Sequence, residues 1–231
     1  MSILLAVFDM AGTTVSDDNN VAKAFQKAFA INEIEISAKD VNPLMGYHKP
    51  LAIQMILEKA GASFDAKLIE KIHADFESEM TDFYEYSPEV KPMPGAEEIF
   101  EYLKEKGVRV ALNTGFSRKI ADTIITRFQW KERGLVDDLI GSDEVEMGRP
   151  HPFMIKKLMS NAGIDNPRHV AKIGDTAVDI EEGENAGCRY VVAVTTGAHS
   201  EDELQKMEPT HIINHLSDLP AILFNVNVIH S

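Results

Sequence analysis

Four short apolar runs occur along the chain, and each ends in small or polar residues: ILLAVFD, VRVALNTG, HVAKIGD and YVVAVTTG. Continuous apolar runs of this length are typical of strands buried on both faces of a parallel sheet. Segments with helical spacing separate them, for example residues 96–106 and 117–128. This alternation predicts an α/β fold with a doubly wound, Rossmann-like parallel sheet. Two weaker runs, LVDDLIGSD and HIINHLSDL, are interpreted as further strands.

The alternation is interrupted between the first and second strong strands. Residues 16–87 show a helical pattern, with apolar residues three and four positions apart. The segment is too long for one crossover helix. We therefore interpret it as an all-helical cap subdomain inserted into a core of residues 1–15 and 88–231. The proline-rich stretch YSPEVKPMPG is expected to bring the chain back to the core.

Composition narrows the classes of partner. The 231-residue chain carries a formal charge of -14, which argues against broad binding to nucleic acid or to an anionic membrane. A phosphate group must therefore be bound locally, by a cation or a small basic cluster. The single cysteine, Cys188, excludes an intrachain disulfide and fits a reducing compartment. The first apolar run is too short to span a bilayer, so we expect a cytoplasmic protein.

Polar side chains stand at the ends of three predicted strands. Ligands bind at the carboxyl ends of strands in open α/β sheets, so Asp9, Thr114 and Asp175 should converge on one crevice. The small-residue loop with Gly12 and Thr13 offers backbone N–H groups and a hydroxyl to a phosphate. A carboxylate held against phosphorus can act as a nucleophile and form an acyl phosphate. The pattern therefore favours phosphoryl chemistry.

Charged residues near this crevice suggest how negative charge would be neutralised. Asp175 and Asp179 are hard oxygen donors, and Mg²⁺ prefers a few carboxylates together with water and substrate phosphate. Asp9, Asp175 and a backbone carbonyl would make such a site, whereas Asp179 either joins it or caps the following helix. Arg149 in GRPHPF could hold nucleophile and phosphoryl oxygens together.

These ordered motifs resemble those of the haloacid dehalogenase-like hydrolase superfamily. Within it, five segments resemble those of phosphonatases, or phosphonoacetaldehyde hydrolases: DMAGTTV, NTGFSR, GRPHPFM, IGDTAVDIEEGENAG and, in the cap, MGYHK. The resemblance implies that Asp9 is the nucleophile, that Mg²⁺ is held by Asp9, the Ala11 carbonyl and Asp175, and that Lys49 forms an imine (Schiff base) with the substrate. The expected substrate-binding residues are Gly12, Thr13, Met45, His48, Gly115 and Phe116, beside the catalytic Thr114 and Arg149.

Ala11 fits this interpretation. Ordinary relatives carry a second aspartate at this position, which protonates the leaving alkoxide of a phosphate ester. When a carbon–phosphorus bond breaks, a lysine imine can accept the electron pair instead, and the second acid becomes dispensable. Phosphonatases also carry a histidine three residues after the lysine, where this chain has Ala52. We expect His48, four residues earlier, to replace it as a proton carrier.

Several alternatives stay open from the residues alone. Lys49 also fits a solvated lysine at a helix start. A phosphomonoester phosphatase would use it only to contact substrate, and a dehalogenase would need no metal. A binding protein on a degenerate hydrolase fold is disfavoured by the intact motifs. The expected partner is a small phosphorylated or phosphonate substrate, and the apolar segment KAFQKAFAI in the cap suggests a surface for a homodimer.

Overall fold

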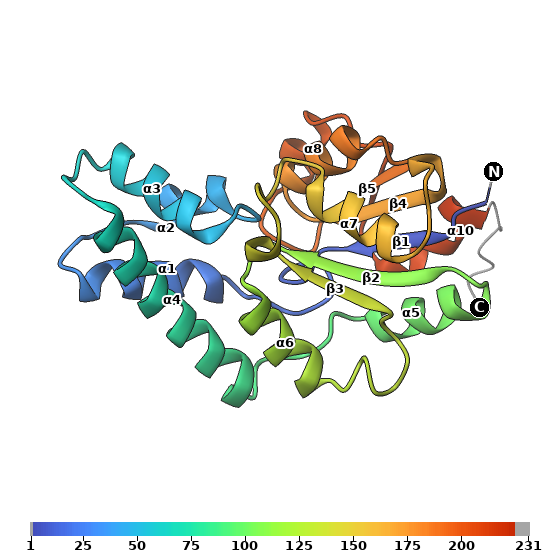
Figure 1. Ribbon diagram of the computed structural model, residues 1–231, viewed down its shortest axis with the longest axis horizontal. Coiled ribbons are helices and arrows are strands. Elements are labelled where there is room, and N and C mark those ends of the chain that lie inside the picture. The colour runs from blue at the N-terminus through green and yellow to red at the C-terminus, as the bar shows by residue number, and fades with distance from the viewer. Residues whose placement is uncertain (1, 225–231) are drawn as a thin grey trace.

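Six parallel strands form a single sheet in the order β3-β2-β1-β4-β5-β6 (Figure 1). The structure is a computed structural model and describes residues 2–224. The strands are β1 Leu5–Phe8, β2 Arg109–Thr114, β3 Asp138–Gly141, β4 Val170–Gly174, β5 Tyr190–Val194 and β6 His211–Ile213. This arrangement confirms the doubly wound α/β prediction, including the two weaker strands.

The strand order of the sheet reverses at the central strand β1. Leu5 pairs with Arg109 of β2 and with Val170 of β4, and all four residues of β1 are buried. The chain builds β2 and β3 on one side of β1 and then returns to build β4, β5 and β6 on the other. Ligands bind in the crevice outside the carboxyl ends of the strands at such a reversal. The residues that follow β1, β2 and β4 are therefore the first to consider.

Helices cover both faces of the sheet. Side chains alternate along β1, so that Ala6 and Phe8 enter one apolar layer while Leu5 and Val7 enter the other. The first layer is covered by α5 Ala96–Glu105, α6 Arg118–Arg127 and α10 Leu219–Phe224. The second is covered by α7 Phe153–Asn161, α8 Ala177–Ala186 and α9 Glu201–Gln205. Within residues 2–224, we find no helix with the length and apolarity that a membrane crossing requires.

The predicted cap segment forms a helical group beside the carboxyl edge of the sheet (Figure 1). Its helices are α1 Asn20–Ile31, α2 Ala38–Val41, α3 Lys49–Lys59 and α4 Ala66–Tyr86. The apolar face of α1 packs against α4, with the rings of Phe25 and Phe76 4.4 Å apart. That face is the one expected to be exposed for a homodimer, and it is instead buried inside the cap. The boundaries at residues 16 and 87, like the homodimer, stay predictions.

Cap and core meet closely at two glycines. A Cβ atom at Gly115, in the loop after β2, would lie 2.5 Å from the carbonyl oxygens of Gly46 and Tyr47 in the cap. Gly46 has a φ of +83°, and a Cβ there would lie 2.6 Å from the hydroxyl oxygen of Thr176, just before α8. Side chains at either position would separate the two parts. The cap segment 45–47 is therefore seated between the loop after β2 and the start of α8.

Candidate active site

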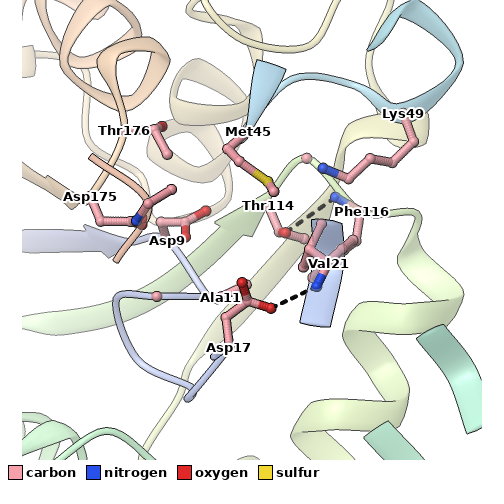
Figure 2. A pocket seen from close by; sticks show the side chains of 14 residues that line it. Asp9, Ala11, Asp17, Val21, Met45, Lys49, Thr114, Phe116, Asp175 and Thr176 are labelled. Atoms are coloured by element: carbon pink, nitrogen blue, oxygen red, sulfur yellow. Dashed lines mark hydrogen bonds between the residues drawn. The ribbon is translucent and has the colours of Figure 1, made fainter. Parts of the chain in front are cut away.

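A small cavity lies where the carboxyl ends of β1, β2 and β4 meet the cap (Figure 2). Its volume is about 30 Å³, and residues of both the core and the cap segment line it. Its lining residues from the core include Asp9, Ala11, Gly12, Thr114, Gly115, Phe116 and Asp175. Those from the cap segment include Asp17, Met45 and Lys49. The structure thus brings Asp9, Thr114 and Asp175 to one crevice.

Asp9 is a buried carboxylate paired with a buried guanidinium. It follows β1 directly, is 5% exposed, and its Oδ1 accepts a hydrogen bond of 2.6 Å from Nη1 of Arg149. Burial raises the pKa of Asp9, and the positive charge of Arg149 opposes that rise. The ion pair fixes one carboxylate oxygen. The other is left to face the cavity.

Arg149 is the centre of a buried network. Its Nη1 also lies 2.9 Å from Oδ1 of Asp179, its Nε donates to Glu182, and its Nη2 donates to the carbonyl and the side-chain oxygen of Asn113. Burial would raise the pKa of Asp179, but Arg149 and Lys172 bring it down to about 2. A planar guanidinium with five donors suits this multiple pairing. Arg149 is thereby held rigidly against Asp9.

Sequence reasoning missed three members of this network. Lys172 lies 2.9 Å from Oδ1 of Asp179 and donates to Oδ1 of Asn113, and both carboxylate oxygens of Glu182 accept from Nδ2 of Asn113. Lys172 was visible as the one charged residue within the apolar run HVAKIG. Glu182 follows Asp179 by three residues and therefore shares its face of α8.

Asp175 is held by the loops on either side of it. Its Oδ1 accepts from the hydroxyl of Thr13 at 2.9 Å, and its Oδ2 accepts from the backbone N–H of Ala198 at 2.8 Å. Burial raises the pKa of Asp175 well above its usual range, and the charges of Asp9 and Asp179 raise it further. Thr13 was expected to contact the phosphate. In the structure its side chain is fully buried, and its hydroxyl donates a hydrogen bond to Asp175.

The carboxylates fit a divalent cation. Asp9, Asp175 and Asp179 each present an oxygen, and these oxygens lie within 4.8 Å of one another. The buried carboxylates around this cavity outnumber the buried cations: Asp9, Asp175, Asp179 and Glu182 stand against Arg149, Lys172 and Lys49. Negative charge is thus left without a buried partner, and uncompensated charge is strongly unfavourable in such a setting. A bound divalent cation would offset it.

Lys49 occupies the cap side of the cavity. It opens α3, is 3% exposed, and its Nζ lies 5.0 Å from the ring centroid of Phe116 and 5.6 Å from that of Phe25. Among residues 2–224, no carboxylate forms an ion pair with it. Burial lowers the pKa of Lys49 to about 8, with Asp9 opposing the shift. Lys49 is thus a desolvated amine rather than a solvated lysine.

The remaining predicted residues fall into two groups. Gly12, Met45, Gly115 and Phe116 line the cavity, and Thr114 accepts from the backbone N–H of Phe116 at 3.2 Å. His48 does not line the cavity. It directly precedes α3 and lies close to Gly148, where an added Cβ would be 3.1 Å from the Cβ of His48. Ala52, at the position of the phosphonatase histidine, is fully buried among the cap's apolar residues. Ala52 therefore cannot replace the phosphonatase histidine as a proton carrier.

The fold and site together define a doubly wound α/β hydrolase with a carboxylate at the switch point and a helical cap above it. The model of the haloacid dehalogenase-like hydrolase family matches residues 6–193, and the chain belongs to this family. The pairing of Asp9 with Arg149 and the nearby Asp175 therefore lies in an enzyme of hydrolase type.

Similar proteins agree with this assignment. A phosphonoacetaldehyde hydrolase from Bacillus mycoides (strain KBAB4) is 30% identical over 226 residues, which cover 92% of this chain and 84% of that protein. One from Bacillus cereus (strain ZK / E33L) is 29% identical with the same coverage. Among solved structures, a phosphonoacetaldehyde hydrolase-like protein from Oleispira antarctica matches with a TM-score of 0.85 at 21% identity, covering 97% of this chain and 92% of that one. A predicted phosphoglycolate phosphatase from Haemophilus somnus matches with a TM-score of 0.81 at 22% identity, covering 96% and 98%.

Proposed function

We propose that this hydrolase cleaves the carbon–phosphorus bond of phosphonoacetaldehyde or a close analogue. The observation that carries the proposal is Lys49: a buried amine, without a carboxylate partner among the described residues, that shares one cavity with Asp9. Its pKa of about 8 keeps roughly a tenth of the amine neutral at pH 7. A neutral amine attacks an aldehyde and forms an imine. The similarity to phosphonoacetaldehyde hydrolases supports the same chemistry.

Each reacting group then has a role. The imine carbon formed with Lys49 is bonded directly to the carbon that bears phosphorus. Asp9 attacks phosphorus and forms an aspartyl phosphate, and the electron pair of the broken bond moves into an enamine. Arg149 holds Asp9 in place and offsets the charge repulsion of the attack. Thr114 and the N–H of Gly115, which line the cavity, would hold phosphoryl oxygens, and water would then release phosphate from Asp9.

The carboxylate cluster is proposed to hold Mg²⁺. Asp9, the Ala11 carbonyl and Asp175 would be its ligands, because the oxygens of Asp179 are already engaged by Arg149, Lys172 and Thr176. When bound, the cation would reduce the repulsion between Asp9 and an anionic substrate. Excess EDTA should abolish turnover and added Mg²⁺ should restore it. Turnover of a haloacid that persists in EDTA would instead favour a dehalogenase.

The proposal is tested by trapping the imine. Incubation with Mg²⁺ and phosphonoacetaldehyde should release acetaldehyde and inorganic phosphate, and borohydride added during turnover should leave a mass adduct on Lys49. Lys49→Arg should abolish both signals. Lys59→Arg, at an exposed position in the same helix, is the matched control and should change neither. An intact wild-type protein that gives no adduct would overturn the proposal.

A phosphomonoester phosphatase is the second candidate. The observation that favours it is Ala52, which leaves the cavity without the histidine that phosphonatases carry at this position. A panel of sugar and nucleotide phosphates would reveal it, and turnover of one of them should then survive Lys49→Ala. Ala11 counts against this candidate because the loop after β1 supplies no second acid.

A further inference from the structure

Asp17 places a carboxyl group in the same cavity as Lys49 and Asp9. It belongs to the segment between β1 and α1, and its Oδ1 accepts a hydrogen bond of 2.9 Å from the backbone N–H of Val21 (Figure 2). Among residues 2–224, its Oδ2 has neither a hydrogen bond nor an ion pair. One oxygen is therefore fixed by the start of α1, while the other faces the cavity.

The surroundings of Asp17 favour its protonated form more than water would. Partial burial raises its pKa, the hydrogen bond from Val21 and the charge of Lys49 oppose the rise, and Asp18 adds to it. Lys23 and the buried phenol of Tyr84 are the other titratable groups that sense its charge. An acid with a raised pKa, one oriented oxygen and one open oxygen has the properties of a general acid.

We propose that Asp17 is the acid–base residue of the imine steps at Lys49. This assignment rests on the proposed function. It supplies a proton donor in a cavity where Ala11 replaces one acid and Ala52 leaves no histidine. Asp17 also lines an adjoining cavity of about 210 Å³, which lies between the cap segment and the loop after β5.

The proton balance closes over one cycle. The neutral amine of Lys49 adds to the aldehyde carbon, and transfer of its proton to oxygen gives a carbinolamine. Protonated Asp17 gives its proton to the carbinolamine hydroxyl, which leaves as water while the nitrogen lone pair forms the C=N bond. After the carbon–phosphorus bond has broken, the enamine carbon takes a proton from water, and the hydroxide left behind is neutralised by the proton that hydrolysis of the aspartyl phosphate releases. Asp17, now a carboxylate, takes a proton from the water that adds to the resulting iminium, and so returns to its acid form. The carbinolamine formed in this way passes its hydroxyl proton to nitrogen and breaks down to acetaldehyde and the neutral amine of Lys49.

Asp17→Asn separates this role from helix capping. The amide oxygen of asparagine still accepts the hydrogen bond from Val21, so the thermal midpoint should stay within a few degrees of wild type. The amide cannot transfer the proton, so the rate of adduct formation on Lys49, measured by borohydride quenching at timed intervals, should fall by about 10²- to 10⁴-fold. Asp18→Asn, at the exposed neighbouring position, should form the adduct at the wild-type rate.

Asp17→Ser gives a second test, because its hydroxyl can also cap the helix and it should show the same loss. A Lys49 adduct that forms at the wild-type rate in either folded variant would overturn the role of Asp17 and leave the proposed function intact. No adduct in the wild-type protein would instead overturn the proposed function, and the role of Asp17 with it. The wild-type trapping reaction thus tells the two failures apart.

Discussion

Two lysines are buried on opposite sides of the active site, and their environments differ in kind. Lys172, in β4, lies against Asp179, Glu182 and Asn113, all within 3.4 Å of its Nζ. Lys49, at the start of α3, lies against the rings of two phenylalanines. A buried ammonium stays charged when acceptors surround it and loses its proton more readily when they do not. The core lysine is therefore suited to holding carboxylates in place, and the cap lysine to covalent chemistry.

The largest expected effect is the loss of activity on replacing the cap lysine. Lys49→Met should lower kcat with phosphonoacetaldehyde by roughly 10³-fold or more, as the loss of a covalent nucleophile does in other enzymes. The free energy of unfolding should not fall, because the change removes a buried amine without an ion-pair partner. Steady-state kinetics and urea denaturation check the two parts. A variant that keeps its activity would show that Lys49 has no covalent role.

The core lysine should show the opposite behaviour. Lys172→Met leaves Asp179 and Glu182 without one of their two buried cations. Breaking a buried ion pair by removing one partner typically costs about 3–5 kcal/mol of stability. Urea denaturation at constant pH should show this loss, against no loss in Lys49→Met. Equal stability changes in the two variants would mean that the environments do not differ as described.

The pH dependence of stability sharpens the comparison further. The pKa of Lys49 falls from 10.5 to about 8 in the folded protein, so between these values the unfolded chain binds more protons and stability rises with pH. Below pH 8 the full penalty applies, on the order of 3 kcal/mol. The wild-type protein should therefore gain stability relative to Lys49→Met between pH 8 and 10.5. A constant difference between the two across this range would show that the amine is not desolvated.

The smallest effect is expected at His48, beside Lys49 in sequence but outside the cavity lining. Burial lowers the pKa of His48, and the nearby His73 lowers it further, so the ring is mostly neutral at pH 7. His48→Ala should leave the rate of imine trapping nearly unchanged, whereas loss of a proton carrier would lower it by about 10²-fold or more. A hundredfold loss would revive its expected role as proton carrier and weaken that of Asp17.

The pattern of apolar and polar residues was sufficient to predict the parallel sheet. Runs such as ILLAVFD and HVAKIGD are apolar on both faces, so strand identity, parallel pairing and the convergence of Asp9 with Asp175 follow from the sequence. The motif resemblance added Lys49. The environments of the two lysines were beyond reach, because they depend on which rings or carboxylates distant segments bring to each amine. Asp17 was missed for the same reason: next to another aspartate in a polar linker, it looks like an ordinary turn residue.

The glycine contact between cap and core bears on how fast the enzyme can work. The cavity of about 30 Å³ beside Asp9 and Lys49 shares residues with the larger cavity of about 210 Å³, and Met45 of segment 45–47 lines both. If substrate entry displaces this segment, each turnover includes one opening and one closing of the contact between Gly46 and Gly115. If that movement is slower than bond breaking, it sets the ceiling on kcat, and a change far from any reacting atom can alter throughput.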